Sequence, residues 1–197
     1  SEVVIYGGAN RKLEAYYLTP ILPYYTKQLN QRTDDNILWS LSLDLSFWKG
    51  KEFYAEFLID DFQHDFKDEP NQTGYLVGTN LTNPFGLNGT FFNFEYSRLR
   101  FWLYGATVSW NRFLFHEVGL GSVLGPDADL IRGSFLYHLT KEFSLQTSVS
   151  YKRQGEGQIA ISYPAPLPEI SKFPSGVVEK TTSFEISGIF QPNSKFK

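Results

Sequence analysis

The alternation of apolar and polar residues between Ile37 and Trp48 constrains the fold more than any other feature of the sequence. Side chains of a β-strand point in turn to opposite faces of a sheet, so an apolar residue at every second position predicts a strand with one apolar face. Those positions hold Ile37, Trp39, Leu41, Leu43, Leu45 and Phe47, and most positions between them hold Ser or Asp. We therefore expect a sheet that separates an apolar from a polar environment.

A second strand with the same alternation follows the tight turn Lys49-Gly50-Lys51. The hairpin register expected from this turn places Phe47 opposite Phe53 and keeps the apolar residues of both strands on one face. On the polar face it places Asp44 opposite Glu56. These two like charges would need a neighbouring cation, and an Arg or Lys from elsewhere on the sheet is the favoured one. A bound Ca2+ is the less favoured alternative, because two carboxylates alone are a poor site for it.

A second hairpin is predicted between Ile131–Leu139 and Phe143–Tyr151. Its register places Gly133 opposite Val149 on the apolar side, and it directs Arg132 to the polar side. The whole chain is therefore predicted to be all-β and antiparallel, with about nine strands. The remaining strands are expected at Val3–Gly7, Lys12–Leu18, Gly74–Thr82, Thr90–Tyr104 and Lys180–Phe190.

The phase of the alternation slips near Ser97 in the strand expected over Thr90–Tyr104. A β-bulge at this point would place Glu95, Arg98 and Arg100 together on the polar face. Such charges could bind an anionic or sugar ligand, or they could cross-link the wall of the sheet. The cross-linking role is the favoured interpretation, because enclosed charges need partners in any case.

The composition is rich in aromatic residues without being hydropathic. Aromatic residues make up 17% of the chain, yet the mean hydropathy is only -0.28. This combination is typical of a transmembrane β-barrel, since half the residues of a membrane-spanning strand face a polar lumen. A helical membrane protein is excluded, because the sequence has no run of about 18 apolar residues.

Short and long connections alternate between the expected strands. Outer-membrane barrels have short periplasmic turns and long extracellular loops, so we expect a transmembrane barrel whose chain begins on the outer side. An odd number of strands does not close an antiparallel barrel, and Lys195-Phe196-Lys197 is typical of the start of another strand. Residues 1–197 are therefore expected to form a single barrel segment, incomplete at both ends, with the remaining strands from the same chain.

Charge, cysteine content and histidine spacing disfavour several functions. The net charge of -3 supplies no basic face for nucleic acid, and the lack of Cys removes thiolate metal sites and cysteine nucleophiles. The spacing of His64, His116 and His138 does not bring any of them to a Ser and an acid. We therefore expect no nucleic-acid partner, no metal or other cofactor, and no catalysis.

Trp110 belongs to a segment in which aromatic residues accompany Asn111 and Arg112. Aromatic rings beside polar groups are typical of surfaces that bind sugars, because such ligands present both apolar and hydrogen-bonding faces. The alternative is that the segment folds back into the barrel mouth as a plug, and this is the favoured interpretation.

Three short segments occur in the order Phe57–Phe62, Phe94–Arg98 and Leu124–Leu130. Together with Tyr6-Gly7-Gly8 and Tyr17–Pro20, they resemble the Wzi-type capsule assembly proteins over most of the chain. The resemblance implies an outer-membrane barrel of about eighteen strands that retains or organises capsular polysaccharide, with this chain as roughly its C-terminal half. The N-terminal half of such a barrel and the family's helical portion have no counterpart in these residues.

We therefore expect a non-enzymatic protein of the bacterial outer membrane, with membrane lipid on its exterior, that binds or organises capsular or surface polysaccharide. One alternative is an outer-membrane porin, in which the same inward charges line an open channel. Another is a barrel enzyme acting on lipid or glycan, which requires His116 or His138 to meet a Ser and an acid. The expected polysaccharide contacts are Asp60, Glu95, Arg98, Trp110, Asp127 and Arg132.

Overall fold

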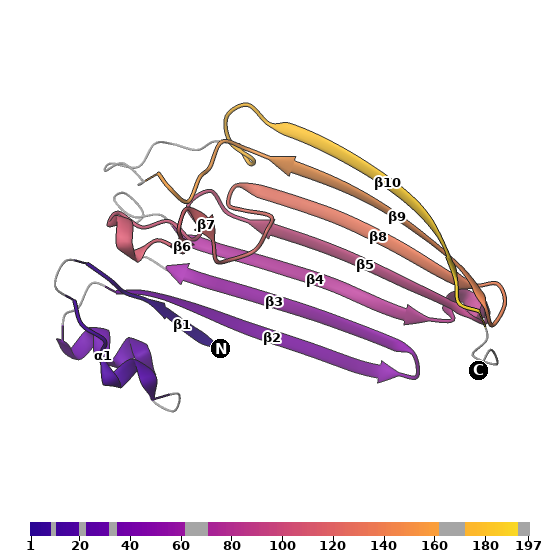
Figure 1. Ribbon diagram of the computed structural model, residues 1–197, viewed down its shortest axis with the longest axis horizontal. Helices are drawn as coiled ribbons and strands as arrows, with labels where there is room; N and C mark the ends of the chain where they lie inside the picture. The colour runs from indigo at the N-terminus through magenta and orange to yellow at the C-terminus, as the bar shows by residue number, and fades with distance from the viewer. Residues whose placement is uncertain (9–10, 20–22, 32–34, 62–70, 162–171, 193–197) are drawn as a thin grey trace.

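The computed structural model describes residues 1–8, 11–19, 23–31, 35–61, 71–161 and 172–192. In this part of the chain, eight strands form one antiparallel sheet in the order β1-β2-β3-β4-β5-β8-β9-β10, seen as a curved wall in Figure 1. The prediction of an all-β, antiparallel fold is confirmed. The strands are β1 (Glu2–Ile5), β2 (Asn36–Trp48), β3 (Lys51–Asp61), β4 (Gln72–Thr82), β5 (Thr90–Leu99), β8 (Ala128–His138), β9 (Phe143–Gln154) and β10 (Glu179–Phe190).

The two faces of the sheet differ in composition, as the alternation predicts. We call one face the polar face. One row of paired residues that crosses it consists of Ser42, Glu56, Leu76, Ser97, Leu130, Lys152 and Thr181. We call the opposite face the aromatic face. The neighbouring row lies on it and consists of Leu43, Ala55, Val77, Tyr96, Ile131, Tyr151 and Thr182. Adjacent rows point to opposite sides of the pleated sheet, so the two faces meet different surroundings.

The register of the first hairpin differs from the prediction. Phe53 pairs with Leu45 rather than Phe47, and Glu56 pairs with Ser42 rather than Asp44. A shift of two residues keeps every side chain on its predicted face, so the apolar pattern alone does not distinguish the two registers. The prediction of two adjacent carboxylates was therefore wrong, and Glu56 instead accepts a hydrogen bond of 2.6 Å from the Ser40 hydroxyl.

The second hairpin has the predicted register, with Gly133 opposite Val149. The bulge predicted near Ser97 was wrong, because β5 pairs without interruption with both β4 and β8. The strand ends at Leu99, and the aromatic residues after it leave the sheet, which is why the apolar phase changes there. As a result, Glu95 lies on the polar face and Arg98 on the aromatic face.

The strand predicted over Lys12–Leu18 was wrong. Residues Ala15–Leu18 form the 3-10 helix η1, in which the Tyr17 and Thr19 amides donate to carbonyls three residues earlier. These backbone groups are then not free to form a strand ladder. The connection from β1 to β2 also contains α1 (Tyr24–Gln31), and because β1 pairs antiparallel with β2, β1 runs opposite to the direction expected.

The connections divide the sheet into two different ends (Figure 1). The turn end holds the short connections β2–β3, β4–β5 and β8–β9, the second of which includes η2 (Pro84–Gly86). The loop end holds the long connections between β1 and β2, β3 and β4, β5 and β8, and β9 and β10. Phe62 and His64, like Lys195–Lys197, belong to segments outside the described residues.

The β5–β8 loop (residues 100–127) packs against the polar face at the loop end. It contains η3 (Ser109–Asn111) and the small hairpin β6 (Leu114–Phe115) and β7 (Val118–Gly119), which Figure 1 shows near the loop ends of β4 and β5. Its side chains join residues of the sheet in one buried cluster: Leu38, Leu99, Leu103, Tyr104, Phe113, Leu124 and Ala128. None of the helices in the described part of the chain has the length and apolar character needed to cross a membrane.

Candidate functional site

A pocket of about 530 Å3 lies between the polar face and the β5–β8 loop. Its floor comes from the middle of the sheet and its roof from the loop. Both charged and apolar side chains line it, among them Glu56, Glu95, Arg132, Lys152, Tyr104 and Leu124. A concave site with a few polar groups on an apolar wall has the form of a small-molecule or saccharide site.

The charges on the floor are separated by sign. Glu56 on β3 and Glu95 on β5 are acidic, whereas Arg132 on β8 and Lys152 on β9 are basic. Glu95 and Arg132 are direct cross-strand partners, at the line where the two signs meet. A ligand in the pocket would therefore meet hydrogen-bond acceptors on one side and donors on the other.

A chain of side-chain hydrogen bonds crosses the floor from β3 to β5. The Tyr54 hydroxyl donates to the Glu95 carboxylate at 3.1 Å and accepts from the Asn93 amide at 3.0 Å. The Tyr54 ring reaches Glu95 by passing over Gly78 of β4, where an added Cβ would lie 2.2 Å from the ring. Gly78 is thus the sequence signal for this network, since a glycine inside a strand often marks a close approach.

Tyr104 forms much of the roof and is held on several sides. Its hydroxyl accepts a hydrogen bond of 3.1 Å from the Ser122 amide, and its ring covers Gly121, where a Cβ would lie 2.3 Å away. Burial raises the pKa of the Tyr104 hydroxyl, because the charged form would lose its hydration. The Tyr104 backbone amide donates to the Asp60 carboxylate at 2.7 Å.

Asp60 and Asp127, two of the predicted contacts, hold the loops together. Asp60 is buried near the end of β3 and binds the Tyr104 amide. Asp127 is fully buried, and it accepts hydrogen bonds from the Ser175 hydroxyl at 2.7 Å and the Gly157 amide at 3.1 Å. The carboxylate of Asp127 therefore ties the start of β8 to both halves of the β9–β10 connection.

The other predicted contacts lie apart from one another. Glu95 and Arg132 meet in the pocket, whereas Arg98 points to the aromatic face, where its guanidinium lies 3.7 Å from the centre of the Phe173 ring. Trp110 is half-exposed, and its side chain packs on the backbone of Gly7 and Gly8, where an added Cβ would lie 3.2 Å away. Of the predicted set, the structure brings only Glu95 and Arg132 together.

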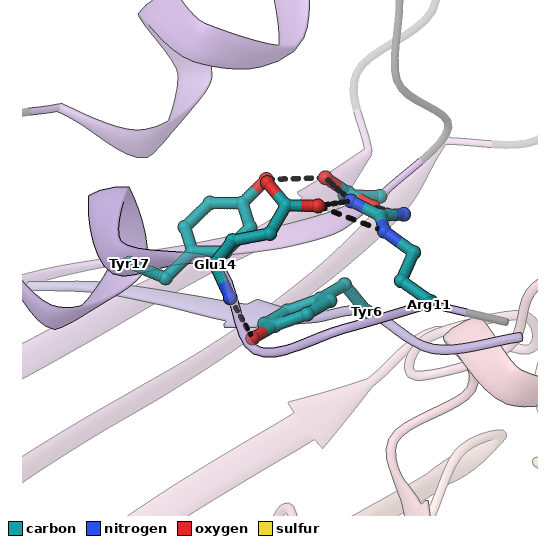
Figure 2. A network of polar contacts seen from close by, with 5 residues as sticks. Tyr6, Arg11, Glu14 and Tyr17 are labelled. Carbon is teal, nitrogen blue, oxygen red and sulfur yellow. Dashed lines mark hydrogen bonds and ion pairs between the residues drawn. The ribbon is translucent and has the colours of Figure 1, made fainter.

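A polar network in the β1–β2 connection was not predicted (Figure 2). The Arg11 guanidinium donates to Glu14 at 2.7 and 2.9 Å and to the buried Asp35, and the Tyr17 hydroxyl also donates to Asp35. The bond to Asp35 raises the pKa of Arg11. The Tyr6 and Tyr17 rings lie 4.7 Å apart beside it. Spacing gave no sign of this network, because Arg11 and Asp35 are distant in sequence.

The histidines of the enzyme alternative are both exposed. His116 lies in the turn between β6 and β7, and its ring packs on Phe115. His138 lies at the turn end, with Nδ1 2.7 Å from the Ser144 hydroxyl oxygen, and no carboxylate of the described residues hydrogen-bonds to this imidazole. The described part of the chain also has no group of three or more His, Asp or Glu placed to hold a metal ion.

Searches against protein-family models, curated proteins and solved structures found no match to this chain. The fold is that of an antiparallel β-sheet protein whose two faces differ chemically. Its function is inferred from the geometry of those faces.

Proposed function

We propose that this chain forms part of the wall of a bacterial outer-membrane β-barrel that binds or organises capsular or surface polysaccharide without catalysis. The observation that supports it is the pairing of an exposed aromatic face with a polar face that holds a loop-covered pocket. In such a barrel the aromatic face contacts lipid and the polar face lines the lumen. The wall closes with strands beyond the eight in the described sheet.

The exposure of the aromatic face supports a membrane location. Large apolar side chains at the middle of several strands are between about one third and three quarters exposed: Leu41 72%, Phe57 41%, Phe94 39%, Ile131 44%, Val149 51% and Phe184 69%. Exposed apolar patches of soluble monomers seldom extend across a whole sheet, because each Å2 kept in water costs about 25 cal/mol. Lipid tails remove that cost.

The pocket supports saccharide binding. Its roof supplies the Tyr104 ring and aliphatic surface, and its floor supplies Arg132, Lys152 and Glu95. A sugar ring presents both C–H faces and hydroxyl groups, and the mixture of apolar wall and directed polar groups matches both. The loop that forms the roof is on the loop end, the side that long loops occupy on the cell surface in outer-membrane barrels.

The membrane location is tested by a matched pair of arginine substitutions. Val149 lies on the aromatic face and its neighbour Ser150 lies on the polar face. Val149→Arg is expected to lower the free energy of unfolding from lipid vesicles by about 2–4 kcal/mol, because it places a charge against hydrocarbon. Ser150→Arg is expected to change it little. Equal effects of the two substitutions would rule out a lipid-facing role for this surface.

The binding function is tested by a glycan array probed with the detergent-solubilised protein. Arg132→Ala, in the pocket, is compared with Arg98→Ala on the opposite face. Selective glycan binding that Arg132→Ala weakens and Arg98→Ala preserves would support the proposal. Absence of binding to any surface glycan, with the protein correctly folded, would contradict it.

The separation of charge on the floor also favours a second function, a diffusion channel. Acidic residues on β3 and β5 opposite basic residues on β8 and β9 would impose a transverse field on a passing solute. Single-channel conductance in planar bilayers tests this function. A channel would conduct, whereas a barrel whose lumen is blocked by the β5–β8 loop conducts little. For the enzyme alternative, turnover of lipid or glycan that His138→Ala or His116→Ala abolishes would replace the non-enzymatic proposal.

A further inference from the structure

A row of four charged residues crosses the aromatic face at the loop end. Arg98 on β5 pairs with Asp129 on β8, Asp129 pairs with Arg153 on β9, and Arg153 pairs with Lys180 on β10. We call these residues the basic row. Three cations and one anion leave an excess of two positive charges at the loop end of a face on which most of the large side chains are aromatic or aliphatic.

Asp129 forms an ion pair with one of these cations, Arg153. Its buried carboxylate is bound by both Nε and Nη2 of Arg153, the former at 2.8 Å, and it lies 3.4 Å from the Tyr96 hydroxyl. Within the described residues, no carboxylate forms an ion pair with Arg98 or Lys180. Arg153 and Lys180 are like charges directly across a ladder, and Asp129 offsets only the charge of Arg153, to which it is bound.

Phe173 shapes the site at Arg98. The Arg98 guanidinium lies 3.7 Å from the centre of this ring, so a residue of the β9–β10 connection covers one of its faces. Stacking occupies a flat face of a guanidinium and leaves the N–H groups at its edge able to donate. Arg98 is thus held in position while its donors remain available for an anion.

The basic row borders the apolar part of the aromatic face. The next row with the same orientation toward the turn end contains Tyr96, Ile131 and Tyr151, and the one beyond it contains Phe94, Val149 and Phe184. In the proposed barrel, this border is the level at which hydrocarbon gives way to lipid headgroups. An anion at that level would have its apolar chains beside the aromatic rows.

We propose that the basic row binds the phosphates of a diphosphorylated glycolipid in the membrane leaflet at the loop end, one at Arg98 and the other at Lys180. This inference rests on the proposed membrane location of the sheet. Arg supplies paired N–H donors and Lys a point charge, the two groups that proteins use to hold phosphate. The acyl chains of the same lipid lie along the aromatic face, so the occupant is a lipid rather than free phosphate or a polysaccharide.

The test is lipid binding by the protein in detergent, measured by native mass spectrometry with diphosphoryl lipid A and with the same lipid after phosphate removal. Arg98→Gln with Lys180→Gln is expected to weaken binding of the phosphorylated lipid roughly tenfold or more, because two cations are lost near the headgroup. The matched control is Lys49→Gln with Lys51→Gln, which removes two cations from the turn between β2 and β3, at the other end of the sheet. This control is expected to retain the affinity of the unsubstituted protein.

Three results would overturn the inference: equal weakening by the control pair, equal binding of the phosphate-free lipid, or full displacement of the lipid by millimolar inorganic phosphate. Folding of each variant is checked by the strand content in its circular dichroism spectrum. Insertion of the unsubstituted protein into vesicles is measured in the same preparation. Failure to insert would overturn the membrane location together with this inference, whereas insertion without a preference for phosphorylated lipid would overturn the basic row alone.

Discussion

At the loop end of the sheet, Leu103 and Asp127 are fully buried, whereas at the turn end Trp48 and Phe190 are 69% and 68% exposed. The loop end is covered by its own long connections, which pack a hydrophobic cluster and several carboxylates against the polar face. The turn end has only short connections and keeps its aromatic side chains on the surface. The same strands are thus buried at the loop end and exposed at the turn end.

Two sources of stability are therefore combined in one sheet. At the loop end, burial and hydrogen bonds inside the protein hold the strands, so this end can stay ordered without help from its surroundings. At the turn end, the strand ladder depends on what covers the exposed aromatic residues, which in the proposed barrel is lipid. Substitutions at the two ends are therefore expected to have different costs.

The largest effect is expected from Leu103→Ala. Leu103 is fully buried in the loop-end cluster, and truncation of such a leucine leaves a cavity that costs about 2–5 kcal/mol of the free energy of unfolding. Phe85→Ala is the matched control, because Phe85 is 98% exposed at the turn end. Urea unfolding in detergent measures both. Similar losses for the two variants would break the distinction between the ends.

Asp127→Ala is expected to have the next largest effect, about 2–3 kcal/mol, because buried hydrogen bonds to a charged group are lost and their donors are left unpaired. Asp127 has a φ of 56°, a conformation that Asn also adopts readily. Asp127→Asn is therefore expected to recover part of the loss. Protease cutting in the β9–β10 connection reports the same change locally, and it should rise in the Ala variant above the Asn variant.

A smaller effect is expected at the turn end from Gly50→Ala. Gly50 has a φ of 73°, and an added Cβ would lie 3.0 Å from the Thr82 Cβ. Backbone strain of this kind costs about 1 kcal/mol. Gly133→Ala is the control, because the nearest atom to its added Cβ is a Val149 methyl at 3.8 Å. A control that unfolds as easily as Gly50→Ala would show that the backbone conformation at Gly50 is unimportant.

The smallest effect expected is a pH dependence at the loop end. Burial raises the pKa of Tyr104 above that of a tyrosine in the unfolded chain. The unfolded chain then loses its proton first as pH rises past about 10, so stability is fully present below that pH and falls until the raised pKa is reached. Tyr104→Phe should flatten this fall in alkaline urea unfolding curves. An unchanged slope would mean that the Tyr104 hydroxyl is not buried in solution.

The strands were predictable wherever the alternation was strict. In β8 and β9 the register expected from the position of the turn is also the register observed. In β2 and β3 a register two residues away matches the faces equally well, so the sequence prediction was wrong in register and correct in face. The segment Lys12–Leu18 failed for a different reason, because adjacent tyrosines formed a local 3-10 turn that a two-residue period does not represent.

The candidate site was predictable only in part. Glu95 and Arg132 lie where the alternation places them, on one face of neighbouring strands. Arg98 was assigned to that face because the end of β5 at Leu99 resembled a bulge in the sequence. The polar face is interrupted by three apolar residues, Leu38, Leu58 and Leu130. These residues could have indicated that a loop covers the polar face there, because apolar side chains are rare on a polar face exposed to water.

The strands, and the sides to which their residues point, follow from the sequence alone, because a strand's period is a local property of the backbone. The contacts of each face depend on the tertiary structure. It places the β5–β8 loop over the polar face, Asp127 between two distant connections, and the basic row across the aromatic face. These features join residues far apart in the chain, through contacts that appear only when the strands are in register. No local pattern records them, since their energy comes from pairing, burial and charge across the folded sheet.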